Sequence, residues 1–385
     1  MALPRADRSI QGTLFMALTV KKKLILAVKV GFSVAMLWVI FHKVTEQHGA
    51  DALWQRLGGL SFGWFALAVV MMLCAVVCSV VRWGWLLKGQ GIHASWGFLG
   101  ASFLIARFWG AFTPGGFTGH GGWRIYDIAK HTGKTARATA TIGVEMVLGQ
   151  LAFGVVVMLA SLYGVRFIGI RGVLLVNAMF AGIMVVGITL LARPQVFRWL
   201  ARKLPHGVQA KVASLVEAVC AYQGKMRLLI QAALLGIGTH AFNNLVFVCA
   251  ARALDVKLGV GEVFFGSSLQ ILATLLPASI NGIGLREAAA VALYTRLGIP
   301  ATEAVLIPIV GFAAEMLVSA SGGVLFMLRK PTYRPDIHVD ESDEVHSDVV
   351  ESSREPGRTP LLPWHEVLRR SVASGAWAGI FIGVL

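Results

Sequence analysis

Long runs of apolar residues dominate the first 330 positions of the chain. A helix needs about 20 apolar residues to cross the hydrocarbon core of a bilayer, and six runs reach or approach that length. We therefore predict six membrane-spanning helices, over residues 24–41, 62–81, 138–163, 173–191, 228–250 and 301–328. The first run is too long for the apolar core of a signal peptide, so we treat it as an uncleaved span.

Two further apolar runs end in proline and glycine instead of continuing as spans. Residues 96–112 and residues 263–276 each lead into such a segment. Proline removes a backbone donor, and glycine leaves the helical conformation at low cost. We predict that each run is one half of a re-entrant hairpin. The expected hairpin backbone residues are Pro114, Gly115, Gly116, Gly119, Gly121 and Gly122 in the first, and Pro277, Asn281, Gly282 and Gly284 in the second.

Basic residues set the expected orientation. With both hairpins re-entrant, most lysine and arginine residues fall on one side, which the positive-inside rule makes cytoplasmic. Both ends of the transmembrane domain then lie in the cytoplasm. Each hairpin is followed by a membrane helix with a glutamate in its interior, Glu145 or Glu315, and the two hairpins enter from opposite sides, as in an inverted repeat. The predicted fold is an all-α polytopic integral membrane protein of the cell (inner, cytoplasmic) membrane.

The composition divides the chain into four parts. Residues 1–23 form a cytoplasmic N-terminal tail, and residues 24–330 form the transmembrane domain. Residues 331–371 are acidic and contain five prolines, which predicts a solvated, disordered tail. Residues 372–385 form a short apolar terminal segment.

The overall composition excludes several classes of protein. Apolar residues make up 56% of the chain and charged residues only 14%, whereas soluble domains carry about 25% charged residues. The net charge of +15 is explained by cytoplasmic loops, so we expect no nucleic acid partner. The four cysteines lie in apolar surroundings and predict core residues, not a metal site. The common hydrolase, metalloprotease and nucleotide-binding motifs are missing from the sequence, and we expect no enzyme activity and no cofactor.

Charged residues inside membrane segments are costly and are therefore functional candidates. Arg286 and Glu287 follow Gly284 directly and are expected to open the second half-helix, where a helix N-terminus suits a phosphate. Arg124 is expected to play the same part after the first break, and Arg107 lies in the half-helix before that break. The alternative is internal pairing, of Arg286 with Glu315 and of Arg124 with Glu145, which would hold the hairpins closed.

His240 and Asn243 share one face of the span over 228–250, together with Asn244. They either line a cavity or bond between helices. The predicted substrate-binding set is Arg107, Arg124, Glu145, His240, Asn243, Arg286, Glu287 and Glu315.

The segment from Pro114 to Tyr126, with Glu145 on the next helix, resembles the lysylphosphatidylglycerol synthase transmembrane-region family. The segment from Pro277 to Ala288 does so as well, and the likeness covers roughly residues 20–330. Trp123 stands where the family usually has an aspartate. Members are flippase-like membrane proteins, or the membrane half of the multiple peptide resistance factor, which translocates aminoacylated phospholipids.

The resemblance implies a flippase-like transmembrane domain, and the cationic candidates favour a phosphate-bearing ligand. We therefore predict a lipid translocase that moves a phospholipid or a polyprenyl-phosphate carrier between leaflets. A membrane-embedded transferase and a secondary transporter of a small anion are the alternatives. The expected partner is a membrane lipid with an anionic head group, and homo-oligomerisation stays open.

Overall fold

The protein is almost entirely helical wherever its structure is described. The computed structural model describes residues 31, 35, 36, 38, 39, 42, 50–112, 117–203, 206–275, 282–329 and 337–339. In chain order the helices are α2 (Ala50–Gly58), α3 (Phe62–Gly89), α4 (Trp96–Phe112), α5 (Phe117–Thr132), α6 (Thr135–Ser161), α7 (Val165–Ala192), α8 (Pro194–Ala201), α9 (His206–Cys220), α10 (Met226–Ala253), α11 (Val260–Leu275), α12 (Leu285–Tyr294) and α13 (Ala301–Leu328). Two short 3-10 helices, η1 (Leu162–Gly164) and η2 (Thr295–Leu297), and two strands, β1 (Ile92–Ala94) and β2 (Ile337–Val339), complete the described elements.

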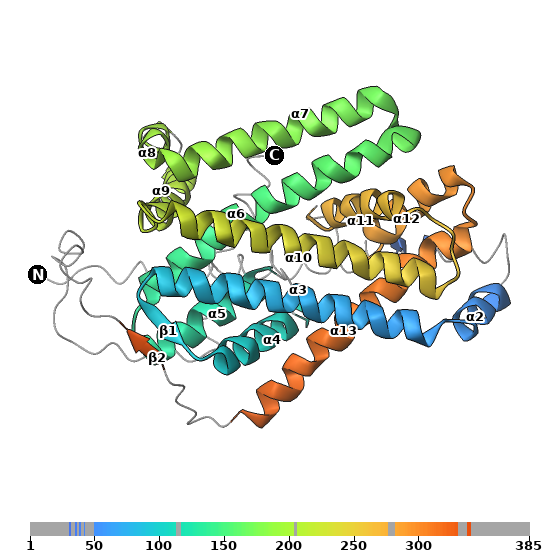
Figure 1. Ribbon diagram of the computed structural model, residues 1–385, viewed down its shortest axis with the longest axis horizontal. Coiled ribbons are helices and arrows are strands. Elements are labelled where there is room, and N and C mark those ends of the chain that lie inside the picture. The colour runs from blue at the N-terminus through green and yellow to red at the C-terminus, as the bar shows by residue number, and fades with distance from the viewer. Residues whose placement is uncertain are drawn as a thin grey trace, which may run out of the picture.

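Four helical stretches are long and apolar enough to cross a membrane. Three of them are α3, α10 and α13, and the fourth is a 58-residue stretch that contains α6 and α7. Figure 1 shows that α7 turns back alongside α6. The reversal is made at η1 and at Gly169, whose φ of 66° and ψ of 171° are not helical. Glycine adopts a positive φ without the steric cost that other residues meet.

The sequence predicts these long helices well, because an apolar run of this length has few other stable structures in a bilayer. Five of the six predicted spans correspond to α3, α6, α7, α10 and α13. The sixth, over residues 24–41, lies almost wholly outside the described residues. The all-α polytopic class is therefore confirmed, while the exact number of spans stays a prediction.

Both broken runs form two helices that pack on each other, α4 with α5 and α11 with α12. Gly282 and Gly284 have φ values of 76° and 88°, so the chain does leave the helical conformation where the sequence predicts. The first break is shorter than predicted, because Gly119, Gly121 and Gly122 lie inside α5. Packing outweighs their low helix propensity, and Gly119 and Gly121 are buried.

The other hairpin backbone residues lie outside the described part of the chain. They are Pro114, Gly115, Gly116, Pro277 and Asn281. The order of long, short, short and long helices occurs twice, in α3–α6 and in α10–α13. The inverted orientation of these halves, and the depth of the hairpins in a bilayer, stay predictions.

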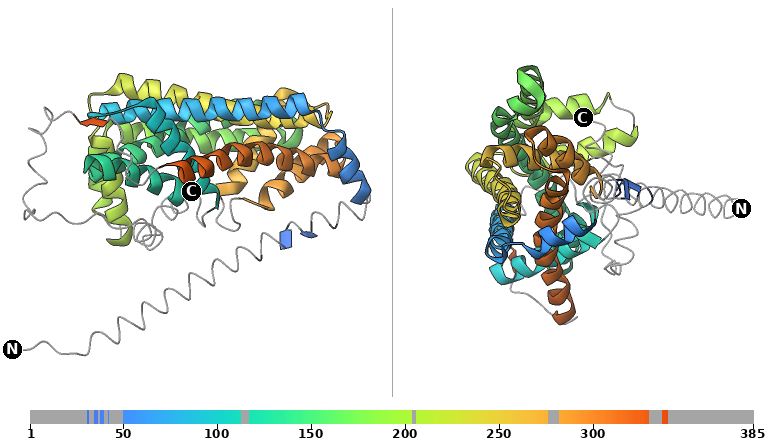
Figure 2. Two further views of the ribbon diagram at one scale, coloured as in Figure 1. Left: turned by 90° about the horizontal axis from the view of Figure 1, so that it is seen from below. Right: turned by 90° about the vertical axis from the view of Figure 1, so that its right-hand side faces the viewer.

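Helices α3 and α10 lie side by side and antiparallel along most of their length (Figures 1 and 2). Their ends are tied together, since the Ser61 amide donates to the Ala253 carbonyl over 2.9 Å and Lys225 Nζ donates to the Gly89 carbonyl. Helix α13 packs against α4 so closely that a Cβ on Gly322 would lie 2.0 Å from the carbonyl oxygen of Leu104. These contacts hold four helices around the interior of the protein.

Strand β2 belongs to the segment predicted as a disordered tail. It pairs antiparallel with β1, with Ile92 opposite Val339 and Ala94 opposite Ile337. Ile337 also packs against the buried apolar cluster to which α3 and α4 contribute. These three residues are therefore ordered, and the rest of the predicted tail lies outside the described residues. The predicted domain boundaries remain predictions.

Candidate functional site

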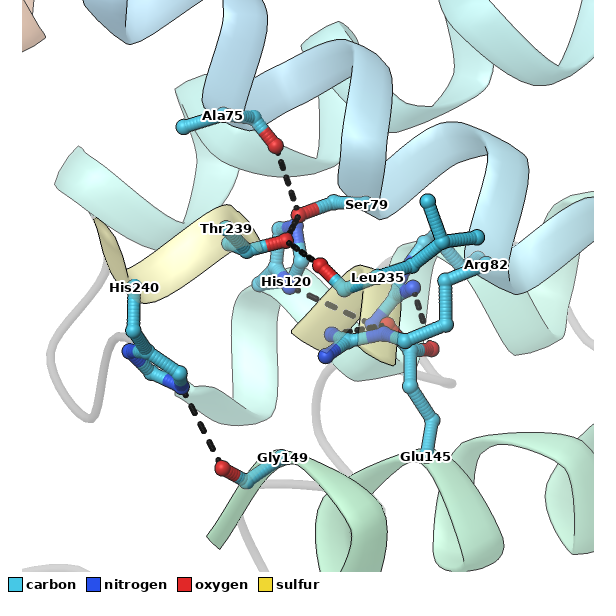
Figure 3. Close-up of polar contacts among 10 residues, drawn as sticks. Ala75, Ser79, Arg82, His120, Glu145, Gly149, Leu235, Thr239 and His240 are labelled. Atoms are coloured by element: carbon cyan, nitrogen blue, oxygen red, sulfur yellow. Dashed lines mark hydrogen bonds and ion pairs between the residues drawn. The ribbon is translucent and has the colours of Figure 1, made fainter. Parts of the chain in front are cut away.

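A buried carboxylate joins two arginines from different helices in the interior of the protein. Glu145 of α6 accepts a hydrogen bond from Arg82 Nη2 of α3 over 2.9 Å and another from Arg124 Nη1 of α5 over 2.7 Å. The three residues are only 8%, 3% and 5% exposed for Arg82, Arg124 and Glu145. Figure 3 shows Arg82 reaching Glu145 from the facing helix. The predicted pairing of Arg124 with Glu145 is thus present, and Arg82 is a second partner.

Arg82 reaches the interior because small residues leave room for its side chain. A Cβ on Gly236 of α10 would lie 3.0 Å from Arg82 Nη1, and one on Gly149 of α6 would lie 3.9 Å from the same atom. Arg82 is not among the residues predicted from the sequence, because it directly follows the apolar run over residues 62–81, where a basic residue usually marks the membrane surface. Instead α3 continues to Gly89 and carries Arg82 inside the bundle.

Aromatic rings and a histidine surround Arg124. Its guanidinium group lies 5.2 Å from the ring centroid of Trp83 and 5.1 Å from that of Phe103, distances at which a cation is attracted to a ring. His120, one turn earlier in α5, meets Phe103 edge-on at 4.9 Å between ring centroids. Arg124 Nη2 donates to His120 Nδ1 over 3.4 Å. His120 is not among the predicted site residues. It lies beside Arg124 because the two residues are one turn apart in α5.

Two further predicted residues belong to the same region. Arg107 of α4 interacts electrostatically with Glu315 of α13, and the charges of Arg82, Arg107 and Arg124 all act on His120. We call Arg82, Arg107, His120, Arg124, Glu145 and Glu315 the arginine cluster. The set contains three guanidinium groups and two carboxylates, so its formal charge is one positive.

Several buried nitrogen atoms of the arginine cluster have no hydrogen-bond partner among the described residues. They are Arg82 Nε, Arg82 Nη1, Arg107 Nε, His120 Nε2 and Arg124 Nε. The four guanidinium nitrogens can only donate. His120 Nδ1 accepts from Arg124, so the neutral ring carries its hydrogen on Nε2, which is a donor too. Unpaired buried donors are costly, and this set matches an anionic acceptor such as a phosphate.

Arg286 and Glu287 begin α12, as predicted, and are 5% and 2% exposed. Glu287 Oε2 accepts a hydrogen bond from the Gly284 amide over 2.7 Å, and Oε1 accepts from Arg286 Nε and Nη2 over 3.0 and 2.6 Å. The guanidinium group also lies 4.2 Å from the ring centroid of Phe312. The predicted pairing of Arg286 with Glu315 is therefore wrong. Its neighbour in sequence, Glu287, is the ion-pair partner that the structure gives it.

Two polar residues of α10, His240 and Asn244, form hydrogen bonds to two different neighbouring helices. His240 Nε2 donates to the carbonyl of Gly149 in α6 over 3.2 Å. Asn244 is fully buried and accepts from Ser267 Oγ of α11 over 2.6 Å. Asn244 thus bonds between helices, whereas Asn243 Oδ1 has no partner within the described ranges.

Long apolar helices packed around a buried ionic cluster define a polytopic α-helical membrane protein. The family model for the transmembrane region of lysylphosphatidylglycerol synthase matches residues 25–322. The chain belongs to this family, as the motifs around Pro114 and Pro277 predict. Membership indicates a function connected with membrane lipids. No curated protein matches the sequence.

Proposed function

We propose that the protein is a lipid translocase that moves a phosphate-bearing lipid between the two leaflets of the cell membrane. The unpaired donors of the arginine cluster are the observation that carries this proposal. These N–H groups donate hydrogen bonds to the phosphate oxygens, and the planar guanidinium groups can each bind two oxygens at once. The lipid tails stay in the bilayer, and the protein acts as a carrier without cofactor or covalent chemistry.

Electrostatics explains why such a site accelerates lipid movement. A charged head group meets a large barrier in the hydrocarbon core, because no water solvates it there. The arginine cluster offers one excess positive charge and donors that are already desolvated. Attraction between charges is stronger in a medium of low dielectric constant. At this site, part of the way across the bilayer, the fixed guanidinium groups therefore replace the water molecules that hydrate the phosphate outside it.

Orientation completes the proposal. Both ends of the transmembrane domain face the cytoplasm, in accordance with the positive-inside rule, and the two hairpins enter from opposite sides. The phosphate then lies between halves of opposite orientation, which is where carriers with inverted repeats hold their substrates.

The test uses arginine-to-lysine variants in proteoliposomes that contain a fluorescent phospholipid, with movement measured by quenching from outside. Lysine at 82 or at 124 keeps a charge beside Glu145 but loses the free donors. We expect at least a tenfold slower movement for Arg82→Lys and Arg124→Lys, with folding retained. Arg166→Lys is the matched control, since Arg166 is 78% exposed and pairs with Glu262 at the surface.

Two results would overturn the proposal. Movement at the rate of the unchanged protein in both well-folded lysine variants would remove the phosphate site. Uptake of inorganic phosphate into the vesicle lumen, without movement of the lipid, would show that the protein is an anion transporter and not a lipid translocase.

A further inference from the structure

His240 lies one helical turn from the point where Arg82 touches α10. Arg82 Nη1 faces Gly236, and His240 follows four residues later on the same face. On the α6 side, Gly149 follows Glu145 by one turn and accepts the hydrogen bond from His240 Nε2. Figure 3 shows His240 turned towards Gly149, with Glu145 further along α6 and Arg82 reaching Glu145 from α3. His240 therefore lies one turn beyond the contact of Arg82 with α10, next to Thr239, whose hydroxyl is already bonded to Ser79 and Leu235.

The ring of His240 has a fixed orientation. Its Nε2 donates to a carbonyl oxygen, so Nδ1 of the neutral ring is an acceptor. The ring also packs against Phe153 of α6, with 5.1 Å between the centroids. Nδ1 is buried and meets no donor in the part of the chain that the structure describes.

Asn243 adds a second acceptor to this position. It lies three residues after His240, on the same face of α10, and its buried Oδ1 likewise has no partner among the described residues. The two side chains thus present unpaired acceptors, whereas the unpaired atoms of the arginine cluster are all donors. A ligand that satisfies both positions carries an anionic acceptor and, a short distance away, a hydrogen-bond donor.

We propose that His240 and Asn243 form a second subsite for a hydrogen-bond donor, a hydroxyl or an ammonium group, on the head group whose phosphate occupies the arginine cluster. This inference rests on the proposed function. The donor of a phospholipid head group lies a few covalent bonds from its phosphorus, and His240 lies about one helical turn, 5.4 Å, along α10 from Gly236, which Arg82 faces. The excess of one positive charge in the arginine cluster matches the single negative charge of a phosphodiester.

The test compares lipids that share a phosphodiester and differ only in the donor. Labelled phosphatidylethanolamine offers an ammonium donor, phosphatidylglycerol offers hydroxyl donors, and phosphatidylcholine offers neither. We expect the protein to move the first two faster than the third. A net hydrogen bond corresponds to about a three- to tenfold effect, so His240→Phe and Asn243→Leu should each reduce this preference by about that factor. The rate for phosphatidylcholine should stay unchanged.

Two variants provide the controls. His240→Gln keeps a donor for Gly149 and should restore part of the preference. Asn177→Leu removes a polar residue of α7 that bonds locally to Ser161 and Val173, and it should leave the preference intact.

The outcomes separate the two proposals. If the three lipids move at equal rates, or if the folded His240 and Asn243 variants keep the full preference, the subsite is refuted while the phosphate site stands. Should His240→Phe fail to fold, Asn243→Leu and His240→Gln decide by the same ratio. If only the preference for phosphatidylethanolamine falls, the subsite is specific for ammonium. If no lipid moves at all, both proposals fail.

Discussion

Replacing Glu145 by glutamine tests whether one carboxylate compensates two buried arginines. Glu145 contacts Arg82 and Arg124 over 2.9 and 2.7 Å, and all three side chains are at most 10% exposed. The amide of glutamine has one oxygen and no charge, so at least one guanidinium group loses its partner. Removing one partner of a buried ion pair costs about 3–5 kcal/mol. We therefore expect the free energy of unfolding of Glu145→Gln to fall by about 3 kcal/mol or more.

The assay is unfolding in mixed micelles titrated with a denaturing detergent, followed by circular dichroism. Glu303→Gln is the matched control, because Glu303 pairs with Arg56, which is 53% exposed, and such a pair contributes about 0.2–1 kcal/mol. Adding Arg124→Met to Glu145→Gln removes one uncompensated charge and should recover part of the lost stability. If Glu145→Gln were no less stable than Glu303→Gln, the two arginines would not depend on Glu145, and the charge count of the cluster would be wrong.

Three further predictions concern packing and protonation. Gly236→Ala places a Cβ 3.0 Å from Arg82 Nη1, so we expect a loss of about 1–3 kcal/mol in the same unfolding assay and slower lipid movement. Gly322→Ala places its Cβ 2.0 Å from the carbonyl oxygen of Leu104; thermal unfolding should show a larger loss than at Gly236, because backbone atoms yield less than a side-chain end. Burial raises the pKa of the Tyr222 phenol, in the turn before α10, so its contribution to stability is complete below about pH 10 and is lost as pH rises above that value. A pH series of unfolding should show this alkaline loss, and Tyr222→Phe should abolish that part of it.

The long helices could be predicted from the sequence because apolar length alone specifies them. The break before α12 could be predicted as well, since Gly282 and Gly284 adopt backbone conformations that few other residues tolerate. The extent of the first break could not, because Gly119 and Gly121 look like loop residues in isolation and are helical only through their packing. Local propensity and tertiary context disagree at these positions, and context prevails.

The candidate site was predictable only in part. The pairing of Arg124 with Glu145 followed from two charges that both needed a partner in a membrane. Arg82 could not be assigned to the pair, because a basic residue at the end of an apolar run usually marks the membrane surface. Its burial depends on Gly236 and Gly149, which belong to other helices, and no pattern along α3 reports on them.

The two halves of the molecule use similar breaks for different purposes. In the second half, Arg286 donates from Nε and Nη2 to Glu287 and lies over the ring of Phe312, and Glu287 also caps α12. In the first half, Arg124 shares its carboxylate with Arg82 and keeps an unpaired Nε. A guanidinium group that has a carboxylate of its own stabilises a fold, whereas one that competes for a shared carboxylate retains capacity for a ligand. The phosphate of a transported lipid is therefore expected beside α5 and α6, and His240 of the second half is expected to accept a hydrogen bond from the rest of the head group.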